Sequence, residues 1–236
     1  GGRHERDATC VAVDNRGAIH PDTSTYNVNN WLGKMVWRPS NRHRFELTGE
    51  YLERSSDNDL LSARRVVVAA PGINYNMNSL LLNDDLRRMR FSLEHKYDAA
   101  GLGLIFDKLT WNMFYQVSET PEHQVEDRDR ITPTPQDRLR IRDYMYRQDH
   151  IGANFNFSKD FTTGALNHTL AYGTEMVTSF SRRVRDATEY NFTTNTVTKV
   201  ISPDTYPLKD MPDTRTSRVG VYIQDEIAWG RDLRHR

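Results

Sequence analysis

Polar and apolar side chains alternate along residues 88–117, in two stretches separated by the segment AAGLG. In the first stretch one phase is apolar or aromatic and the other is mostly charged: Met89, Phe91, Leu93, His95 and Tyr97 against Arg88, Arg90, Ser92, Glu94 and Lys96. In the second, Leu109, Trp111, Met113, Tyr115 and Val117 alternate with Lys108, Thr110, Asn112, Phe114 and Gln116. Successive side chains of a strand point to opposite faces, so the pattern predicts a hairpin with one apolar and one polar face.

The same alternation predicts five more strands, which gives about seven long strands in all. They cover residues 26–38, 45–51, 144–158, 166–176 and 218–229. Several arms run for roughly ten residues, about the length that a tilted strand needs to cross a bilayer.

The segments between these strands alternate between long and short. Short turns are expected at residues 39–43, 99–103 and 159–164, whereas residues 1–25, 53–86, 118–142 and 181–217 are long, polar and without sustained alternation. Residues 1–25 are interpreted as loop. In residues 118–142, Pro121, Pro133 and Pro135 argue against a central strand.

This arrangement predicts an all-β fold: an antiparallel, up-and-down transmembrane β-barrel segment with short periplasmic turns and long extracellular loops. Trp37, Phe45, Tyr97 and Phe157 lie beside short turns, where a lower aromatic girdle is expected. His95 and His168 share the apolar phase but also lie near short turns, where a polar side chain facing lipid costs little.

Composition narrows the class of protein. The 32 basic and 32 acidic residues cancel, so no basic excess indicates a nucleic-acid partner. No apolar run is long enough for a membrane helix, and the single cysteine, Cys10, permits no internal disulfide. The N-terminal segment does not look like a signal peptide. Because seven strands form an odd and open set, we expect an internal piece of a larger barrel.

One alternative fold stays open, and one alternative function is disfavoured. Alternation alone does not distinguish a barrel with its apolar face outward from a soluble antiparallel sheet with that face inward. An enzyme is not expected, because no HExxH, GxSxG, Walker or Rossmann pattern occurs and the eight histidines show no metal-ligand spacing.

Two motifs carry a resemblance to a known family. The turn WRPSNRHRF at residues 37–45 and the strand GVYIQDEI at residues 220–227 resemble TonB-dependent outer-membrane receptors, most of all the haem, haemoglobin and transferrin receptor branch. The resemblance covers most of the chain from about Tyr26. It implies a plugged barrel of 22 strands in the bacterial outer membrane, which imports haem or a ferric siderophore with energy passed from the inner membrane through TonB.

On this basis residues 1–236 are expected to be a partial β-barrel domain: an extracellular loop at 1–25, strands and loops at 26–236, and no plug domain. The partners implied are outer-membrane lipid, the TonB complex through the missing plug, and an extracellular iron or haem source. The chain lacks the family's FRAP and NPNL signature, so no functional residue is carried over. Tyr75, His123 and Tyr190 are candidate ligand contacts in the predicted extracellular loops, since polar aromatic side chains can bind large ligands. A porin-like channel and a soluble β-sheet binding module are the alternative functions.

Overall fold

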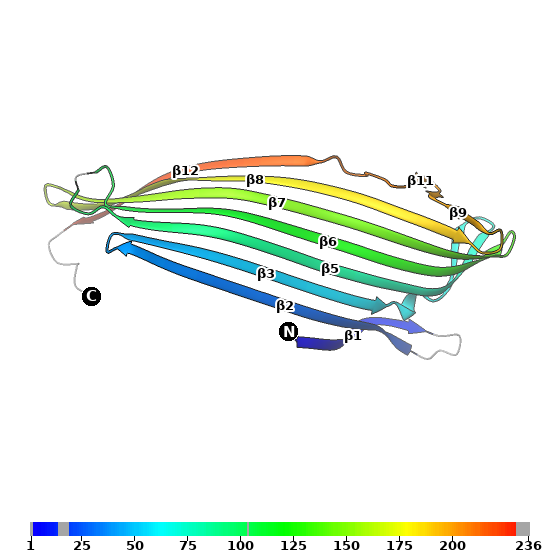
Figure 1. Cartoon of the computed structure of the whole chain (residues 1–236). Coiled ribbons are helices and arrows are strands. Elements are labelled where there is room, and N and C mark those ends of the chain that lie inside the picture. The colour runs from blue at the N-terminus through cyan, green and yellow to red at the C-terminus, as the bar shows by residue number, and fades with distance from the viewer. Residues whose placement is uncertain (1, 14–18, 103, 230–236) are drawn as a thin grey trace.

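The fold is one large antiparallel sheet, seen in a computed structural model that describes residues 2–13, 19–102 and 104–229. Its strands follow the order β1-β2-β3-β5-β6-β7-β8-β12, and the short strands β4 and β9 pair with β5 and β8 (Figure 1). The elements are β1 (Gly2–Val13), β2 (Ile19–Ser40), β3 (His43–Asp59), the 3-10 turn η1 (Leu61–Ala63), β4 (Val66–Ala70), β5 (Ile73–Asp98), β6 (Lys108–Thr132), β7 (Gln136–Thr163), β8 (Leu166–Asn191), β9 (Thr196–Thr198), β10 (Val200–Ile201), β11 (Asp204–Thr205) and β12 (Thr214–Trp229). The predicted all-β architecture of antiparallel, up-and-down strands is confirmed, and the sheet contains β1 in addition to the seven predicted strands.

The register joins the predicted apolar phases into one surface. Leu47 lies opposite Leu93, Leu93 opposite Met113, and Met113 opposite Ala153. The same row continues through Met176 of β8 to Val219 of β12. Paired residues of adjacent strands point to the same side of a sheet, so these side chains share one face. We call this the apolar face, and its opposite the polar face.

A continuous band of mostly apolar and aromatic side chains crosses seven strands on the apolar face, with Thr174, Thr178 and Asp225 among its polar members. This apolar band consists of alternate residues of 31–37, 45–51, 89–97, 109–117, 151–157, 170–180 and 219–227.

The apolar band is not covered by a second layer. Met113 is 47% exposed and Ile151 55%, and Val221 on β12 reaches 81%. Among the described residues only four hydrophobic side chains are buried, and none of them belongs to the band: Ala99, Ala187, Ile201 and Tyr206. Apart from the separate two-stranded pair β10–β11, the described structure is therefore one large sheet with an exposed apolar face, rather than two sheets packed around a dry core.

Aromatic rings line the end of the band nearest the short turns. Trp37 stacks on Phe45 with ring centroids 5.4 Å apart, and Phe157 stacks on Tyr172 at 5.0 Å. His43 lies 4.5 Å from the ring of Tyr97, and its Nδ1 is 3.0 Å from Nε2 of His95. The predicted aromatic row is present beside the β2–β3 turn and the β5–β6 connection, whereas Phe157 lies six residues before the end of β7, because that strand continues through most of the predicted turn at 159–164.

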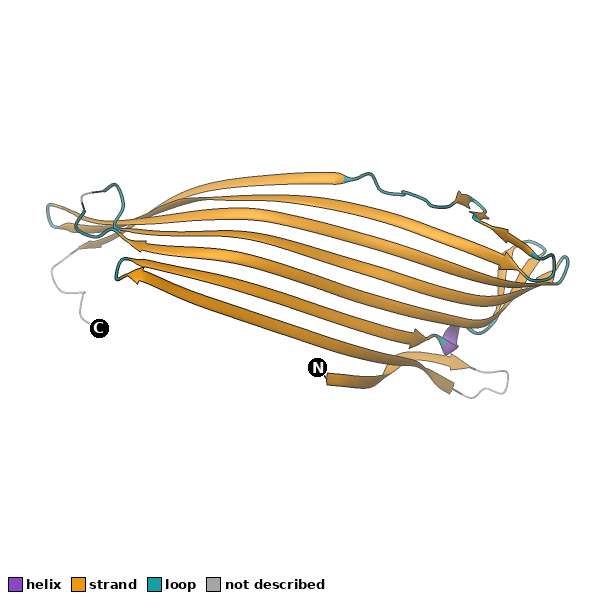
Figure 2. Cartoon of the chain, in the orientation of Figure 1, coloured by secondary structure: helices purple, strands orange, loops and turns teal. Residues whose placement is uncertain are grey.

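The strands are much longer than the sequence pattern indicated. Residues predicted as long polar connections form the outer parts of β3, β5, β6, β7 and β8, and Figure 2 shows few loops between them. The predicted long connection 118–142 contains only a three-residue turn at 133–135 between β6 and β7. Polar side chains occur on both faces in these parts, so the amphipathic alternation is interrupted there and survives only in short stretches such as residues 138–142. We call residues 73–87, 118–132, 136–149 and 181–191 the polar extension.

Two further expectations were wrong. Residues 1–25 were predicted as loop, but 2–13 form β1 and 19–25 begin β2, because backbone pairing from Gly2 with Val28 to Val13 with Ile19 does not need an apolar pattern. Pro121 lies inside β6, opposite Met145 of β7. The ladder with β5 is interrupted beside it, between the pairs Asp84–Glu122 and Arg87–Glu119, so the missing N–H of the proline falls in a gap of that ladder.

The turns gather at the two ends of the sheet. The β2–β3 and β7–β8 turns lie at one end, at the left of Figure 1, and the segments around β4 and β9 lie at the other. The β5–β6 connection, 99–107, is longer than the predicted AAGLG. No helix among the described residues has the length and apolar character to cross a membrane.

Candidate functional site

Arginine and glutamate side chains gather on the polar face of the polar extension. The β6–β7 register places Glu126 opposite Arg140 and Arg128 opposite Arg138. The β7–β8 register then places Arg140 opposite Glu189. Neither pairing contains a register shift. The side chains that face the polar side within the apolar band's part of β6, β7 and β8 are therefore followed, by strict alternation, by side chains on the same polar face in this region. We call Glu126, Arg128, Arg138, Arg140, Arg142 and Glu189 the arginine cluster.

Glu189 is shared by three guanidinium groups. Arg138 Nη1 donates to Oε1 at 2.8 Å, while Arg128 Nη2 and Arg140 Nη2 both donate to Oε2, at 2.6 and 2.7 Å. Arg140 Nε adds a longer bond of 3.1 Å to the same oxygen. Charge-assisted bonds of this kind are stronger than neutral ones, so one carboxylate holds three strands together.

Glu126 holds the other half of the cluster. Arg142 Nη1 donates to Oε1 of Glu126, and Oε2 lies 3.8 Å from both Arg128 Nη1 and Arg140 Nη1. Glu126, Arg128 and Glu189 are 6–7% exposed, which is unusual for charged residues. Each is buried against its ion-pair partners, as expected for charges removed from water.

The cluster carries more positive than negative charge. Four arginines face two glutamates, which leaves a formal charge of +2 at neutral pH. Burial raises the pKa of Glu189, but hydrogen bonds from Arg140 and Arg128 and their charges outweigh it, so the pKa lies below its ordinary value. Burial, followed by repulsion from Arg128, lowers the pKa of Arg140. Such an arrangement can accept a further anionic group.

Tyr75 of β5 completes this surface. The guanidinium carbon of Arg128 lies 4.6 Å from the centre of the Tyr75 ring, a cation–π contact. Nε of Arg128 is buried and has no hydrogen-bond partner. The side chain is therefore oriented by the ring and two carboxylates, while one of its donors stays unused.

The three predicted ligand contacts do not converge. Tyr75 lies at the arginine cluster, but His123 of β6 and Tyr190 of β8 belong to the alternation phase of the apolar face. His123 Nδ1 lies 2.6 Å from Oδ1 of Asp143. Tyr190 lies opposite Leu139 of β7 and Val197 of β9. All three lie in strands rather than in the predicted loops.

The sequence contained a signal for the arginine cluster that the prediction did not use. Residues 138–142 read Arg-Leu-Arg-Ile-Arg, a strict alternation of basic and apolar residues. That pattern places Arg138, Arg140 and Arg142 on one face of a strand. The carboxylates that neutralise them lie on neighbouring strands and follow only from the register.

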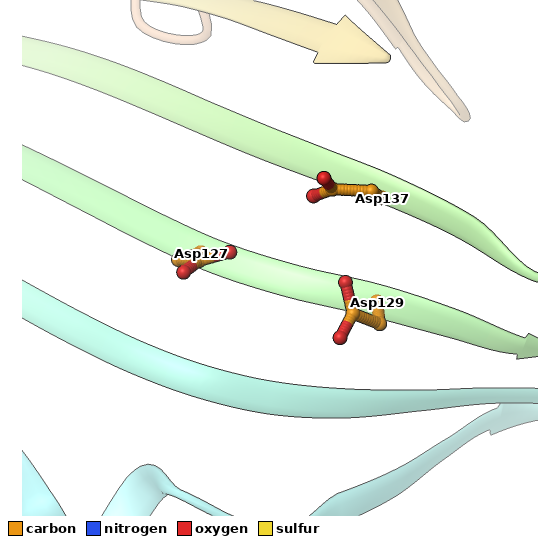
Figure 3. A group of neighbouring side chains, drawn as sticks. All are labelled: Asp127, Asp129 and Asp137. Atoms are coloured by element: carbon orange, nitrogen blue, oxygen red, sulfur yellow. The ribbon is translucent and has the colours of Figure 1, made fainter. Parts of the chain in front are cut away.

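A group of carboxylates lies on the other face of the same region (Figure 3). Asp127 and Asp129 of β6 and Asp137 of β7 offer oxygens that lie within 4.8 Å of one another. Asn78 Nδ2 donates to Asp129 at 3.1 Å and to Asp127 at 3.4 Å, which offsets part of their mutual repulsion. Oxygen ligands of this kind suit hard cations, but clusters of partly exposed aspartates are common without one.

Comparison with known proteins adds no relative. No family model matches the chain, and no curated protein matches it. The functional assignment therefore depends on the geometry of the sheet and on the two sequence motifs.

Proposed function

We propose that the chain forms part of the wall of an outer-membrane β-barrel that belongs to a TonB-dependent receptor. The observation that carries this proposal is the exposed apolar band on a single-layer sheet. Exposed apolar patches of more than a few hundred Å² are uncommon on soluble monomers and mark sites that another apolar surface covers. Acyl chains cover such a face in a membrane barrel.

The height of the band fits a bilayer. On β5 it runs from Met89 to Tyr97, and on β6 from Leu109 to Val117, nine residues in each strand. At roughly 3.4 Å per residue, eight steps correspond to about 27 Å along the strand. A tilt of roughly 40° reduces this to about 20 Å, close to the ~25 Å apolar band of outer-membrane barrels. The aromatic row beside the short turns then lies at the periplasmic interface.

The two edges of the sheet favour a larger barrel. Within the described residues β12 pairs only with β8, and β1 covers only the first part of β2. Unpaired long edges are avoided in native proteins, so further strands are expected beside both. The two motifs that resemble TonB-dependent receptors fit this placement: one forms the β2–β3 turn and the other lies on β12.

The polar face supports the proposed import of an iron-bearing ligand. In a barrel this face lines the lumen, and the polar extension projects on the extracellular side. The net positive charge of the arginine cluster favours an anionic ligand, which fits a ferric siderophore or the propionates of haem. Energy would come from the TonB complex through a plug domain of the complete receptor.

Tryptophan fluorescence tests the membrane placement. All four tryptophans, Trp31, Trp37, Trp111 and Trp229, belong to the phase of the apolar face. In reconstituted vesicles of brominated phosphatidylcholine we expect strong quenching of their emission, and little quenching by aqueous acrylamide.

The opposite result, strong acrylamide quenching without any effect of the brominated lipid, would establish the soluble β-sheet module. A protein that inserts into the vesicles but conducts ions freely, and binds neither haem nor a ferric siderophore, would instead be a porin-like channel. Saturable binding of an anionic iron complex, weakened by Arg138→Gln, supports the receptor.

A further inference from the structure

Basic side chains also lie on the apolar face, just beyond the extracellular border of the apolar band. Arg147 of β7 lies directly opposite Arg182 of β8, and Arg215 of β12 lies opposite Phe180. These residues surround a depression of about 440 Å³, which Asp149, Ser181, Asp213 and Thr214 also line. Because Phe180 is the last apolar residue of β8 in the band, the depression begins where the band ends.

The three arginines are not equivalent. Arg147 Nε and Nη2 donate to the two carboxylate oxygens of Asp149, at 2.9 and 3.0 Å, and Nη1 donates to Glu119 at 2.9 Å. Its charge is therefore offset. Arg182 is exposed, and its guanidinium makes no ion pair or hydrogen bond within the described part of the chain.

The guanidinium of Arg215 contacts an aromatic ring. Its guanidinium carbon lies 5.2 Å from the centre of the Phe180 ring, and it forms no ion pair with any described residue. Two cations directly opposite or beside one another repel, and an anionic group between them removes that repulsion. Arg182 and Arg215 thus offer free donors on the side of the sheet that faces lipid.

An apolar groove crosses the middle of the band next to this depression, from β3 to β8. It has a volume of about 520 Å³, and its walls include Met113, Ile151, Met176 and Thr178. Thr178 lies two residues before Phe180 on the same face of β8, and Ile151 lies opposite it. The cationic depression therefore lies next to one end of an apolar groove, an arrangement complementary to a lipid with an anionic headgroup.

We propose that Arg182 and Arg215 bind the phosphate of a phosphorylated lipid of the extracellular leaflet, while one acyl chain lies in the groove between Met113 and Met176. This inference rests on the proposed membrane placement. Arg147 acts as a positioning residue, because its bonds to Asp149 and Glu119 keep it from folding across the depression. Guanidinium groups bind phosphate through paired N–H donors, and the adjacent Phe180 ring holds Arg215 against the sheet.

The test compares two spin-labelled lipids in phosphatidylcholine vesicles that contain the complete protein. The motionally restricted fraction of the label gives the relative association of phosphatidic acid and phosphatidylcholine. A juxtamembrane basic residue favours an anionic lipid roughly fivefold. We expect phosphatidic acid to be preferred about five- to twentyfold by the native protein, and the preference to fall to about one in R182Q/R215Q.

A matched control lies on the same strand. R218Q removes one arginine of β12 whose side chain pairs with Glu175 on the polar face, at 2.8 Å, so the lipid preference should not change. The preference should also decline as salt is raised, because both arginines are exposed.

Three results would overturn the inference. They are the absence of any preference in the native protein, an equal preference in R182Q/R215Q, and displacement of the labelled phosphatidic acid by millimolar inorganic phosphate, which would identify a site for free anions. Quenching of tryptophan by brominated lipid is measured in the same vesicles. Quenching without lipid preference rejects this inference alone, whereas absence of quenching rejects the membrane placement as well.

Discussion

Neighbouring residues of one strand face different surroundings in this sheet, and Leu93 and Glu94 are the clearest pair. Leu93 lies in the middle row of the apolar band between Leu47 and Met113 and is 37% exposed. Glu94 points to the polar face, where Oε1 lies 3.1 Å from Nζ of Lys96. Placing Leu93 against acyl chains and Glu94 in the lumen leads to opposite expectations for the two positions.

Leu93→Arg should destabilise the protein by about 2–4 kcal/mol, because a charge would face the lipid near the bilayer midplane. The measurement is urea-induced unfolding of the protein refolded into phospholipid vesicles. Glu94→Gln is the control and should be nearly neutral, since it removes only a partly exposed ion pair. Similar losses for the two variants would contradict the assignment of faces.

Glu189 is the residue on which the arginine cluster depends most. Glu189→Gln should cost about 3 kcal/mol or more, because it leaves the charges of Arg128, Arg138 and Arg140 buried without their shared partner. Hydrogen exchange of the β7 and β8 amides would measure this as local opening. Glu175→Gln on the same face of β8 removes a pair that is more than half exposed, so it should cost less than about 1 kcal/mol.

The cluster should also weaken in acid. The pKa of Glu189 in the folded protein lies below its ordinary value of 4.5, so its carboxylate stabilises the native state. That contribution is complete above about pH 4.5 and is lost as the pH falls through the lower, folded value. Exchange protection of the β6–β8 extension should therefore decrease below pH 4.5 in the native protein. In Glu189→Gln this decrease should be smaller, and an unchanged acid response would exclude Glu189 as its source.

At the level of elements, the sequence predicted the strands that have one apolar face and missed the parts that have none. Met89, Phe91 and Leu93 alternate with charged residues, so hydrophobicity alone identifies that part of β5. In residues 122–128 of β6, Glu122, Gln124, Glu126 and Arg128 alternate with His123, Val125 and Asp127, so one phase is polar and the other is polar except for one valine. Cross-strand ion pairs rather than burial favour the extended conformation there, and those partners lie far away in the sequence.

The same dependence on partners that are distant in the sequence explains why the candidate site was only partly predicted. Tyr75 was selected as a polar aromatic residue, and it does lie beside Arg128. Glu189 was not selected, because its partners Arg128 and Arg138 are known only once β6, β7 and β8 are in register. The chemistry of the cluster is thus a property of strand pairing.

Proline gives a test of the length of β6. Val125 pairs with Leu81 on one side and with Ile141 on the other, so Val125→Pro should cost about 1–3 kcal/mol through lost backbone hydrogen bonding. Pro121→Val should stay within about 1 kcal/mol, because the β5 ladder is already interrupted there. Chemical unfolding in vesicles compares the free energies of unfolding of the two variants. An unchanged free energy of unfolding in Val125→Pro would contradict the assignment of this segment to a strand.

At the level of the whole molecule, the two ends of the sheet are expected on opposite sides of the membrane. Thr134 in the β6–β7 turn and Asn41 in the β2–β3 turn are both exposed. In a Cys10→Ser background, Thr134→Cys should react with a membrane-impermeant maleimide on intact cells. Asn41→Cys should react only after the outer membrane is permeabilised. Labelling of both positions on intact cells would rule out the proposed topology.

The uninterrupted pairing of β6 with β7 and of β7 with β8 has a consequence for assembly. A slip of one residue along either ladder would turn Met113 or Met176 toward the polar face and Glu126 or Arg140 toward the apolar face. The penalty accumulates along the whole ladder, so misaligned intermediates are heavily disfavoured. The apolar and charged rows therefore act together to select a single alignment of the strands during folding.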